Sequence, residues 1–317
     1  MDAFSRVVDL AQLHGSLDLR CQLGGSFALD HEPAPMGEAP FHLVLAGRAA
    51  VQLPVGHTAS LGAGDFLMLP RGSAHRMRSA GRKPPAGPMR MQMDGMLPVR
   101  RNTDGDAELD LLCGRFTYAT GPADLIMSAL PDVLHLSLPP TIGRDGLHGI
   151  VALLRSEVHH AQPGALAVVT ALSQALFVLV LRAHAQREGI PASLLVLLGD
   201  RRLSRAVLAM LQHPEQPWTV ATLAEQALMS RATFARHFAL RGGTSPLELL
   251  TLLRMQLARD LLAQGKMSTS DVAERVGYAS DSAFGKVFAQ RMGVTPAAFR
   301  RHFTSARLLA HPRRTAH

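Results

Sequence analysis

The sequence predicts a multidomain chain of α and β structure, with an N-terminal β-barrel, a helical segment, and a C-terminal all-α domain that contains two helix-turn-helix units. The first observation behind this prediction is a motif of paired phenylalanines and a Gly-x-Ser/Thr-Pro turn, which occurs twice in the last third of the 317 residues. The second is a series of short apolar runs, bounded by Gly and Pro, in the first third. A repeat indicates a duplicated unit, and short, evenly spaced runs indicate strands.

The domain boundaries follow the changes between these patterns. We predict a β domain at 1–140, a helical dimerisation segment with its linker at 141–200, a double helix-turn-helix domain at 201–303, and a basic tail at 304–317. Glycine and proline place the linker at about 189–191. We expect the apolar residues 194–198 to pack this linker against the C-terminal domain.

The N-terminal third has the pattern of an all-β sandwich or barrel. Apolar runs at 41–45, 49–53 and 66–70 alternate with turns that contain Gly or Pro. This spacing is typical of small antiparallel barrels, in which strands are short and turns are frequent.

The first copy of the repeat carries the start and stop signals of two short helices. Thr219 is a suitable N-cap for a helix over 220–227, and Ser230 for a second helix over 231–240. Gly243 ends the second helix, because glycine accepts the left-handed conformation of a C-cap. The apolar side chains expected to face the core are Leu223, Ala227, Leu228, Phe234 and Phe238.

The second copy repeats the pattern fifty residues later. Gly277 and Tyr278 form its turn, and Ser280 is a suitable cap for its second helix. The core side chains expected here are Val272, Ala273, Val276, Phe284 and Phe288. Between the copies, residues 246–263 carry leucines at helical spacing, which predicts one long helix that sets the distance between the two units.

The second helix of each copy leaves an open face of small and basic residues. The candidate DNA-binding residues are Arg231, Ala232, Thr233, Ala235 and Arg236, with Asp281, Ser282, Gly285 and Lys286 in the second copy. The major groove of double-stranded DNA admits one helix, small residues permit its close approach, and Arg and Lys supply donors. An all-helical interaction module is the alternative, but it does not explain two basic open faces.

Positive charge is concentrated in the region of the repeat. Residues 201–317 hold 17 Lys and Arg against 7 Asp and Glu, whereas residues 1–200 hold 16 against 18. Such asymmetry points to a polyanion as the partner of one half. Arginines outside the recognition helices are expected to be solvated charges or neighbours of phosphates; these are Arg254, Arg259, Arg291, Arg300 and Arg301.

Residues 201–303 resemble the DNA-binding domain of the AraC/XylS type of transcriptional regulator. The resemblance rests on the copies F-x3-F-x4-G-x-S-P and F-x3-F-x4-G-x-T-P, on Pro-Trp-Thr-Val at 217–220, and on Val-Gly-Tyr at 276–278. It implies seven helices, two of which are recognition helices that carry the candidate residues above. The base-contacting positions are mostly small, so the operator sequence cannot be inferred from them.

Residues 1–140 resemble the cupin sensor domain of one AraC subgroup. The second cupin motif, G-x5-P-x-G-x2-H, is matched in full by Gly64, Pro70, Gly72 and His75. The first motif is incomplete: His42 precedes Gly47 at a suitable distance, but the usual paired His and the Glu are missing, and Pro40 stands at the Glu position. Residues 112–116 add to the resemblance.

His42 and His75 are the candidates for an effector pocket or a metal site. Cupin metals require about three His and a carboxylate, and only His31 and Glu38 are available here as weak third ligands. We therefore expect no cofactor, and keep a metal in the barrel as the alternative. A pocket for a small-molecule effector at the barrel mouth is the default prediction.

Two cysteines, Cys21 and Cys113, lie in the predicted sensor half. Cys21 follows Arg20, whose charge would lower the pKa of the thiol and raise its reactivity. The pair is thus a candidate redox sensor for an oxidant effector, while the alternative is that both are small buried hydrophobic residues. The N-terminus lacks an apolar signal core, which favours a cytoplasmic protein.

Residues 147–160 and 164–186 are predicted to be two helices split by Gln-Pro-Gly. The second is very apolar but falls short of about 20 apolar residues, so we expect a core or dimer helix and no membrane segment. The chain is predicted to be a homodimeric DNA-binding transcriptional regulator, not an enzyme, with RNA polymerase as a further candidate partner. The competing functions are a cupin-type metalloenzyme with a helical appendage, and a nucleoid-type binder without sequence preference.

Overall fold

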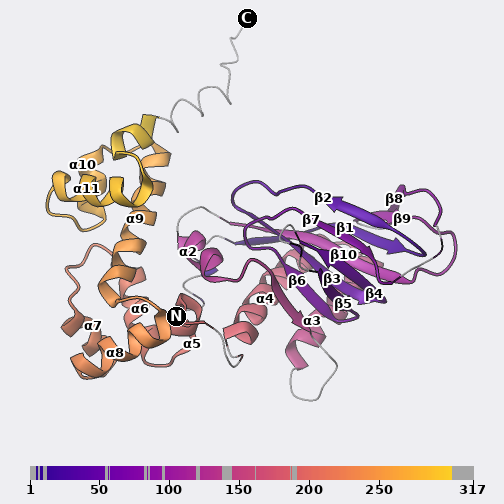
Figure 1. Cartoon of the computed structure of the whole chain (residues 1–317), viewed down its shortest axis with the longest axis horizontal. Coiled ribbons are helices and arrows are strands. Elements are labelled where there is room, and N and C mark those ends of the chain that lie inside the picture. The colour runs from indigo at the N-terminus through magenta and orange to yellow at the C-terminus, as the bar shows by residue number, and fades with distance from the viewer. Residues whose placement is uncertain are drawn as a thin grey trace, which may run out of the picture. The chain divides into compact units, whose positions relative to one another are not determined.

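The computed structural model describes residues 5, 8–9, 13–53, 56, 58–81, 84, 86–94, 97–118, 122–137, 145–160, 162–185, 187 and 191–301. The chain divides into a barrel unit, residues 12–119 and 127–187, and a helical unit, which contains residues 188–317 together with 1–11 and 120–126. Each is described by itself (Figure 1). The predicted tail at 304–317 and most of the predicted linker lie outside the described residues.

The barrel unit consists of a seven-stranded sheet, in the order β11-β6-β3-β10-β1-β9-β8, and a four-stranded sheet, in the order β2-β7-β4-β5. The strands of the first sheet are β1 (His14–Leu23), β3 (Glu38–Ala46), β6 (Asp65–Met68), β8 (Arg90–Asp94), β9 (Leu97–Arg101), β10 (Leu109–Thr117) and β11 (Leu134–Ser137). Those of the second are β2 (Ala28–His31), β4 (Arg48–Gln52), β5 (Thr58–Gly62) and β7 (His75–Ser79). Within the first sheet β1 pairs in parallel with β9 and antiparallel with β10.

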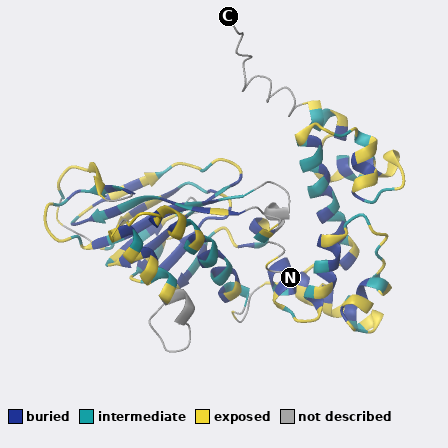
Figure 2. Ribbon diagram, turned by 180° about the vertical axis from the view of Figure 1, so that it is seen from behind, coloured by how far each residue is buried: buried dark blue, intermediate teal, exposed yellow. Residues whose placement is uncertain are grey.

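The core of the barrel lies between the two sheets. One apolar cluster joins Val44 and Leu111 of the large sheet to Val51, Leu61 and Met77 of the small one, all fully buried. Figure 2 shows these inward faces as buried bands along the strands. The apolar runs predicted as strands become β3, β4 and β6, so the predicted sheet-rich N-terminal domain is confirmed.

A single glycine allows the sharp turn between β3 and β4. Gly47 has a φ of 83°, and a Cβ at this position would lie 1.8 Å from the carbonyl oxygen of Glu108. Only glycine fits both the left-handed backbone and this close approach.

Helix α2 (Pro122–Ala129) lies between β10 and β11 in the chain, and helices α3 (Asp145–His160) and α4 (Ala165–Ala185) follow β11. α4 packs against β1 and α3, and Gln174 Nε2 on this helix donates a hydrogen bond to the carbonyl oxygen of Leu13. With 21 residues and a mean hydropathy of 2.0, α4 is long and apolar enough to cross a bilayer. The sequence-based expectation that it falls short was wrong. Core helices also meet this test, and one face of α4 is buried on the sheet.

The helical unit contains α5 (Leu194–Gly199), α6 (Leu203–Gln212), α7 (Val220–Gln226), α8 (Arg231–Gly242), α9 (Pro246–Gln264), α10 (Thr269–Arg275) and α11 (Asp281–Met292). Figure 1 shows α7 and α8 near one end of α9, and α10 and α11 near the other. α5 packs on α8: a Cβ at Gly242 would lie 2.6 Å from Leu197 Cδ1. Residues 194–198 therefore belong to the packed core of this unit, as expected.

Candidate nucleic-acid interface and sensor site

The caps that the sequence predicts are formed in the first helix-turn-helix copy, α7 and α8. The Thr219 side chain accepts from the backbone N–H of Thr222, whose own hydroxyl accepts from the Thr219 N–H, so a capping box starts α7. Ser230 caps α8, and Gly243 ends it in the left-handed conformation with a φ of 67°. Both phenylalanines of the copy, Phe234 and Phe238, are fully buried.

One predicted core residue of this copy is wrong. Leu228 has a φ of 54° and a 72% exposed side chain, because it forms the turn between α7 and α8. The equivalent turn residue of the second copy is Gly277, with a φ of 82°. The N–H of each donates to a Glu carbonyl three residues earlier, Glu225 or Glu274, so the two turns share one geometry. Leu228 is therefore an exposed turn residue, although its side chain is apolar.

The second copy, α10 and α11, has its own core against α9. Val272, Ala273 and Val276 of the first helix region and both phenylalanines pack with Met255, Ala258 and Leu262. Ser268 forms a capping box with Asp271, and Ser280 caps α11. The predicted burial of this copy is thus confirmed.

The candidate DNA-binding side chains lie on the outward faces of α8 and α11. Six are exposed and three, Thr233, Ala235 and Gly285, are half-buried. Nothing lies within 4 Å of a Cβ placed at Gly285, so this face of α11 is open. Asp281 on this face already has a protein partner, because its carboxylate accepts a hydrogen bond of 3.1 Å from Ser270 of α10.

The long helix between the copies sets their separation. α9 has 19 residues, which span about 28 Å at 1.5 Å per residue. One turn of DNA measures about 34 Å, so two recognition helices at the ends of this spacer suit successive major-groove segments.

Arg254 in the middle of α9 has a structural role that the sequence did not reveal. Its Nε and Nη2 atoms donate to the carbonyl oxygens of Pro214 and Gln216 at 2.7 and 2.8 Å, and the guanidinium lies 5.7 Å from the ring centre of Tyr278. Burial lowers the pKa of this guanidinium. Arg254 therefore ties the segment before α7 to the second copy, and the expectation of a solvated charge or phosphate neighbour was wrong for it.

Two other arginines of that set also have protein partners. Arg291 pairs with Glu248 at the start of α9, and Arg300 donates to the carbonyl oxygen of Met267 at 3.3 Å. The pair of Arg291 with Glu248 thus helps to hold α11 on α9, while Arg300 bonds to the segment between α9 and α10. Their positions were visible in the sequence, but their partners lie more than thirty residues away.

In the barrel unit, three histidines come together across the two sheets. His42 on β3 directs Nε2 to His75 Nε2 at 2.7 Å, and the His31 ring stacks on His75 with centroids 4.4 Å apart. One nitrogen of each of the three lies within 4.8 Å of the others. Glu38, the other weak third ligand, instead accepts from Arg115 at 3.0 Å. His31, expected only as a weak third ligand, is thus a full member of the cluster. Its place opposite His75 follows from the pairing of β2 with β7.

All three imidazoles are held in the neutral form. Burial lowers the pKa of His42 well below its usual value, with further lowering by His31 and His75. Burial likewise lowers the pKa of His75, and lowers that of His31 to about 4. Neutral imidazoles each carry one nitrogen lone pair, which suits hydrogen bonding or metal binding.

The two thiols lie next to this histidine cluster. Cys113 faces His42 across the strand pair β10–β3, with Sγ 3.2 Å from His42 Nδ1. Cys21 is on the neighbouring strand β1, and both thiols are free and buried in the barrel core. A hydrogen bond with Cys113 lowers the pKa of Cys21 and raises that of Cys113, whose burial raises it further. The structure thus brings the two cysteines together.

The charge that assists Cys21 is not the one expected. Arg20 points to the opposite face of β1 and forms a two-pronged ion pair with Asp110, with contacts of 2.9 and 2.6 Å. Arg100, the neighbour of Cys21 on β9, lowers the pKa of the thiol instead. Adjacent strand residues face opposite ways, which is why the preceding arginine could not act.

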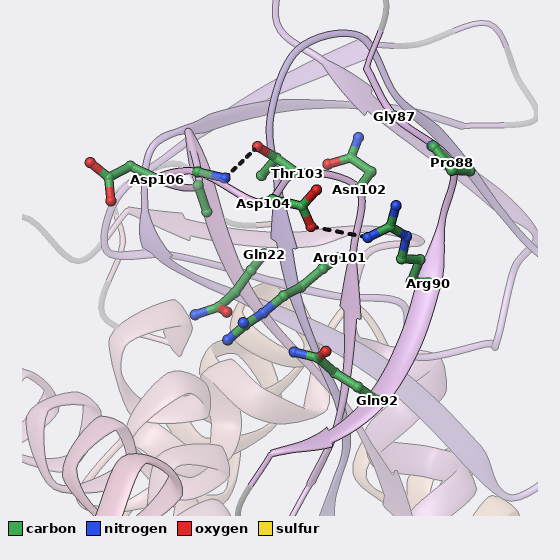
Figure 3. A pocket seen from close by; sticks show the side chains of 12 residues that line it. Gln22, Gly87, Pro88, Arg90, Gln92, Arg101, Asn102, Thr103, Asp104 and Asp106 are labelled. Carbon is green, nitrogen blue, oxygen red and sulfur yellow. Dashed lines mark hydrogen bonds and ion pairs between the residues drawn. The ribbon is translucent and has the colours of Figure 1, made fainter.

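Two of the pockets on the barrel unit bear on the predicted sensor site. The first, of about 360 Å³, is lined by Arg90, Arg101 and Asp104 among others, and Figure 3 shows Arg90 bonded to Asp104. None of the predicted sensor residues lines it. The second, of about 350 Å³, is lined by all three histidines, Cys113 and Arg100. It lies at the predicted effector site and has a size suited to a small ligand.

Comparisons with known proteins agree with this division. A cupin family model matches residues 2–186, more than half of the chain, and a helix-turn-helix domain model matches residues 223–302. An uncharacterized HTH-type transcriptional regulator of Haemophilus influenzae is 33% identical over 301 residues, which cover 95% of this chain and 99% of that protein.

Two further relatives have the same extent. The HTH-type transcriptional regulator MtrA of Neisseria gonorrhoeae is 33% identical, over 95% of this chain and 98% of its own length. The RCS-specific HTH-type transcriptional activator RclR of Escherichia coli is 30% identical, over 95% and 97%. These relatives are transcriptional regulators and not enzymes, so the alternative of a cupin metalloenzyme is not supported. The chain belongs to the family of DNA-binding transcriptional regulators that join a cupin domain to an AraC-type helix-turn-helix domain.

Proposed function

We propose that this chain is a cytoplasmic, homodimeric regulator whose cupin domain senses an oxidant through Cys21 and Cys113 and changes the affinity of the helical unit for its operator. The observation that carries the proposal is the pair of adjacent free thiols in the barrel core, next to a pocket open to solvent. The DNA contacts are assigned to the outward faces of α8 and α11.

The strand register gives oxidation a structural consequence. Cys21 lies opposite Leu111 and Cys113 opposite Leu19, so the two cysteines form a diagonal pair on β1 and β10. Diagonal neighbours have Cα atoms about 7–8 Å apart, whereas a disulfide needs roughly 4.4–6.8 Å. When an oxidant takes two electrons and the thiols lose two protons, the new S–S bond therefore has to draw the two strands together.

Dimerisation is proposed for the outer face of the helices α3 and α4. Leu153, Leu166 and Val168 are 52, 65 and 42% exposed there, which is unusual for side chains of this size on a helix pair. A second copy of the chain would cover them. RNA polymerase is included as a partner because one relative, RclR, is named a transcriptional activator.

The test compares operator binding by reduced protein and by protein oxidised with diamide, with mass spectrometry to locate the disulfide. We expect a change in Kd of about 5–150-fold, the usual range of coupling between two sites. The chain has only two cysteines, so the double variant Cys21→Ser, Cys113→Ser is a thiol-free control that should not respond. A wild-type protein that binds equally in both states, or a thiol-free variant that responds as the wild type does, would refute the thiol sensor and leave the DNA-binding assignment intact.

A further inference from the structure

The histidine cluster is built from two cross-strand pairs, one in each sheet. His31 and His75 are register partners on β2 and β7 in the small sheet, while His42 lies opposite Cys113 on β3 and β10 in the large sheet. The rings of His42 and His75 are 4.9 Å apart between centroids. The three imidazoles thus meet between the sheets rather than along one strand.

The hydrogen-bond partners show which nitrogens carry lone pairs. The carbonyl oxygen of Ser73 can only accept, so the contact of 3.1 Å from His75 Nδ1 places a proton on Nδ1 and a lone pair on Nε2. His42 Nε2 then donates to His75 Nε2, which leaves the lone pair of His42 on Nδ1, 3.2 Å from Cys113 Sγ. His31 Nε2 is buried and has no hydrogen-bond partner.

A buried nitrogen without a partner costs free energy, because it has lost its hydrogen bonds to water. Here the unpartnered atom belongs to a ring stacked on His75, in a cluster that opens onto a pocket. A cation that took lone pairs from all three rings would satisfy this atom and replace the close contact between the other two. One nitrogen of each ring lies within 4.8 Å of the others, so the rings would have to approach by at most about 1.5 Å to share one tetrahedral ion.

We propose that His31, His42 and His75 form a binding site for one divalent transition-metal ion of the zinc class. Neutral imidazoles are ligands for Zn²⁺, whereas Mg²⁺ and Ca²⁺ prefer oxygen. Three protein nitrogens leave a fourth position, which faces the pocket. His75 belongs to the second cupin motif and His42 to the incomplete first motif, whereas His31 belongs to neither. The ligand set contains no carboxylate.

Metal binding requires a small rearrangement of the cluster. Zn–N distances of 2.0–2.1 Å in a tetrahedral site place the nitrogens about 3.3 Å apart, so the His42–His75 contact of 2.7 Å would open slightly. The proton on His42 Nε2 moves to Nδ1 or is released to water, because the metal takes the lone pair of Nε2. The ion would tie β3 of one sheet to β2 and β7 of the other.

The experiment uses the purified, chelator-treated full chain under reducing conditions. Titration with Zn²⁺ alone is followed by calorimetry and elemental analysis, and titration with Co²⁺ by visible absorption. We expect one ion per chain, cobalt bands of a site with three nitrogen ligands, and a midpoint of thermal unfolding that rises with the concentration of Zn²⁺.

Two variants make the assignment specific. His31→Asn removes a half-buried ligand and should weaken Zn²⁺ binding by more than about tenfold. Mutation of a residue that only hydrogen-bonds a ligand can already cause a loss of this size. His159→Asn on the exposed face of α3 is the matched control and should bind like the wild type. Circular dichroism establishes that both variants are folded.

Two results would overturn the proposal: no binding of Zn²⁺ by the intact reduced chain, or binding by His31→Asn as tight as that of the control. The double variant Cys21→Ser, Cys113→Ser should keep the metal, because neither sulfur is a ligand in this assignment. The proposal does not depend on the thiol sensor, and metal stoichiometry is measured without DNA, so the two can fail separately.

Discussion

At the residue scale, Arg236 of α8 and Lys286 of α11 are exposed donors on the outward faces of the two recognition helices. We expect Arg236→Ala and Lys286→Ala each to weaken binding to a specific operator by about 1–3 kcal/mol, because each removes a donor to a base edge. Fluorescence anisotropy with labelled duplex measures this change. Arg202→Ala, an exposed arginine at the start of α6, is the control. Unchanged affinity in both recognition-helix variants would contradict their assignment.

Two glycines of the second copy should respond in opposite ways to an added methyl group. At Gly277 a Cβ would lie 2.5 Å from the carbonyl oxygen of Glu215 on a backbone with a φ of 82°, so Gly277→Ala should destabilise the fold by about 1–3 kcal/mol. At Gly285 no atom lies within 4 Å, and Gly285→Ala should stabilise α11 by up to about 1 kcal/mol. Urea unfolding of the two variants measures both.

The same position separates folding from DNA contact. Gly285→Leu should unfold at the wild-type midpoint or above it, since leucine favours the helix, but should lose operator affinity, because a large side chain prevents close approach to the groove. Wild-type affinity in this variant would show that α11 does not enter the groove by this face.

At this scale the sequence predicted some sites well and others poorly. Cap residues such as Thr219 and Ser280 act on the next few residues, so local spacing is enough to identify them. His31 and Arg100 act across strand pairs, and the effect of Arg100 on Cys21 could not be predicted because the pairing of β1 with β9 is not encoded locally. The orientation of Leu228 was missed for a similar reason, since only its positive φ reveals the turn.

At the scale of elements, α9 is both a spacer and a scaffold, and Arg254 at its centre holds the segment before α7. We expect Arg254→Met to lower the free energy of unfolding by about 1–3 kcal/mol, because the carbonyl groups of Pro214 and Gln216 lose a charged donor. Urea denaturation measures the loss. The salt dependence of DNA binding should keep its slope, since no phosphate contact is removed. A changed slope with unchanged stability would mean that Arg254 contacts DNA after all.

Elements with strong periodicity were predicted closely. The helices α3 and α4 and the strands β3, β4 and β6 fall within a few residues of their predicted ranges, because each buries one regular face. The sequence predicted that residues 194–198 pack against the C-terminal domain, but not that α5 packs on α8. The contact between Leu197 and Gly242 joins residues 45 positions apart. Long-range contacts of this kind depend on the whole fold.

At the scale of the whole molecule, the chain separates a slightly acidic sensor half from a basic DNA-binding half. The two units differ in where their reactive groups lie. The thiols and the histidine cluster lie between the sheets of the barrel, while the basic side chains of α8 and α11 are exposed. In the proposed function, long-range attraction would draw the basic half to DNA, and base contacts from α8 and α11 would select the site.

The central claim is that one chain reads two successive major-groove segments with α8 and α11. Hydroxyl-radical footprinting of the reduced protein on the DNA upstream of its own gene tests this directly. We expect two protected patches on one face of the duplex, about one helical turn apart, and loss of one patch each in Arg236→Ala and Lys286→Ala. A single protected patch, or uniform protection without preference among sequences, would contradict the account and favour a nucleoid-type binder.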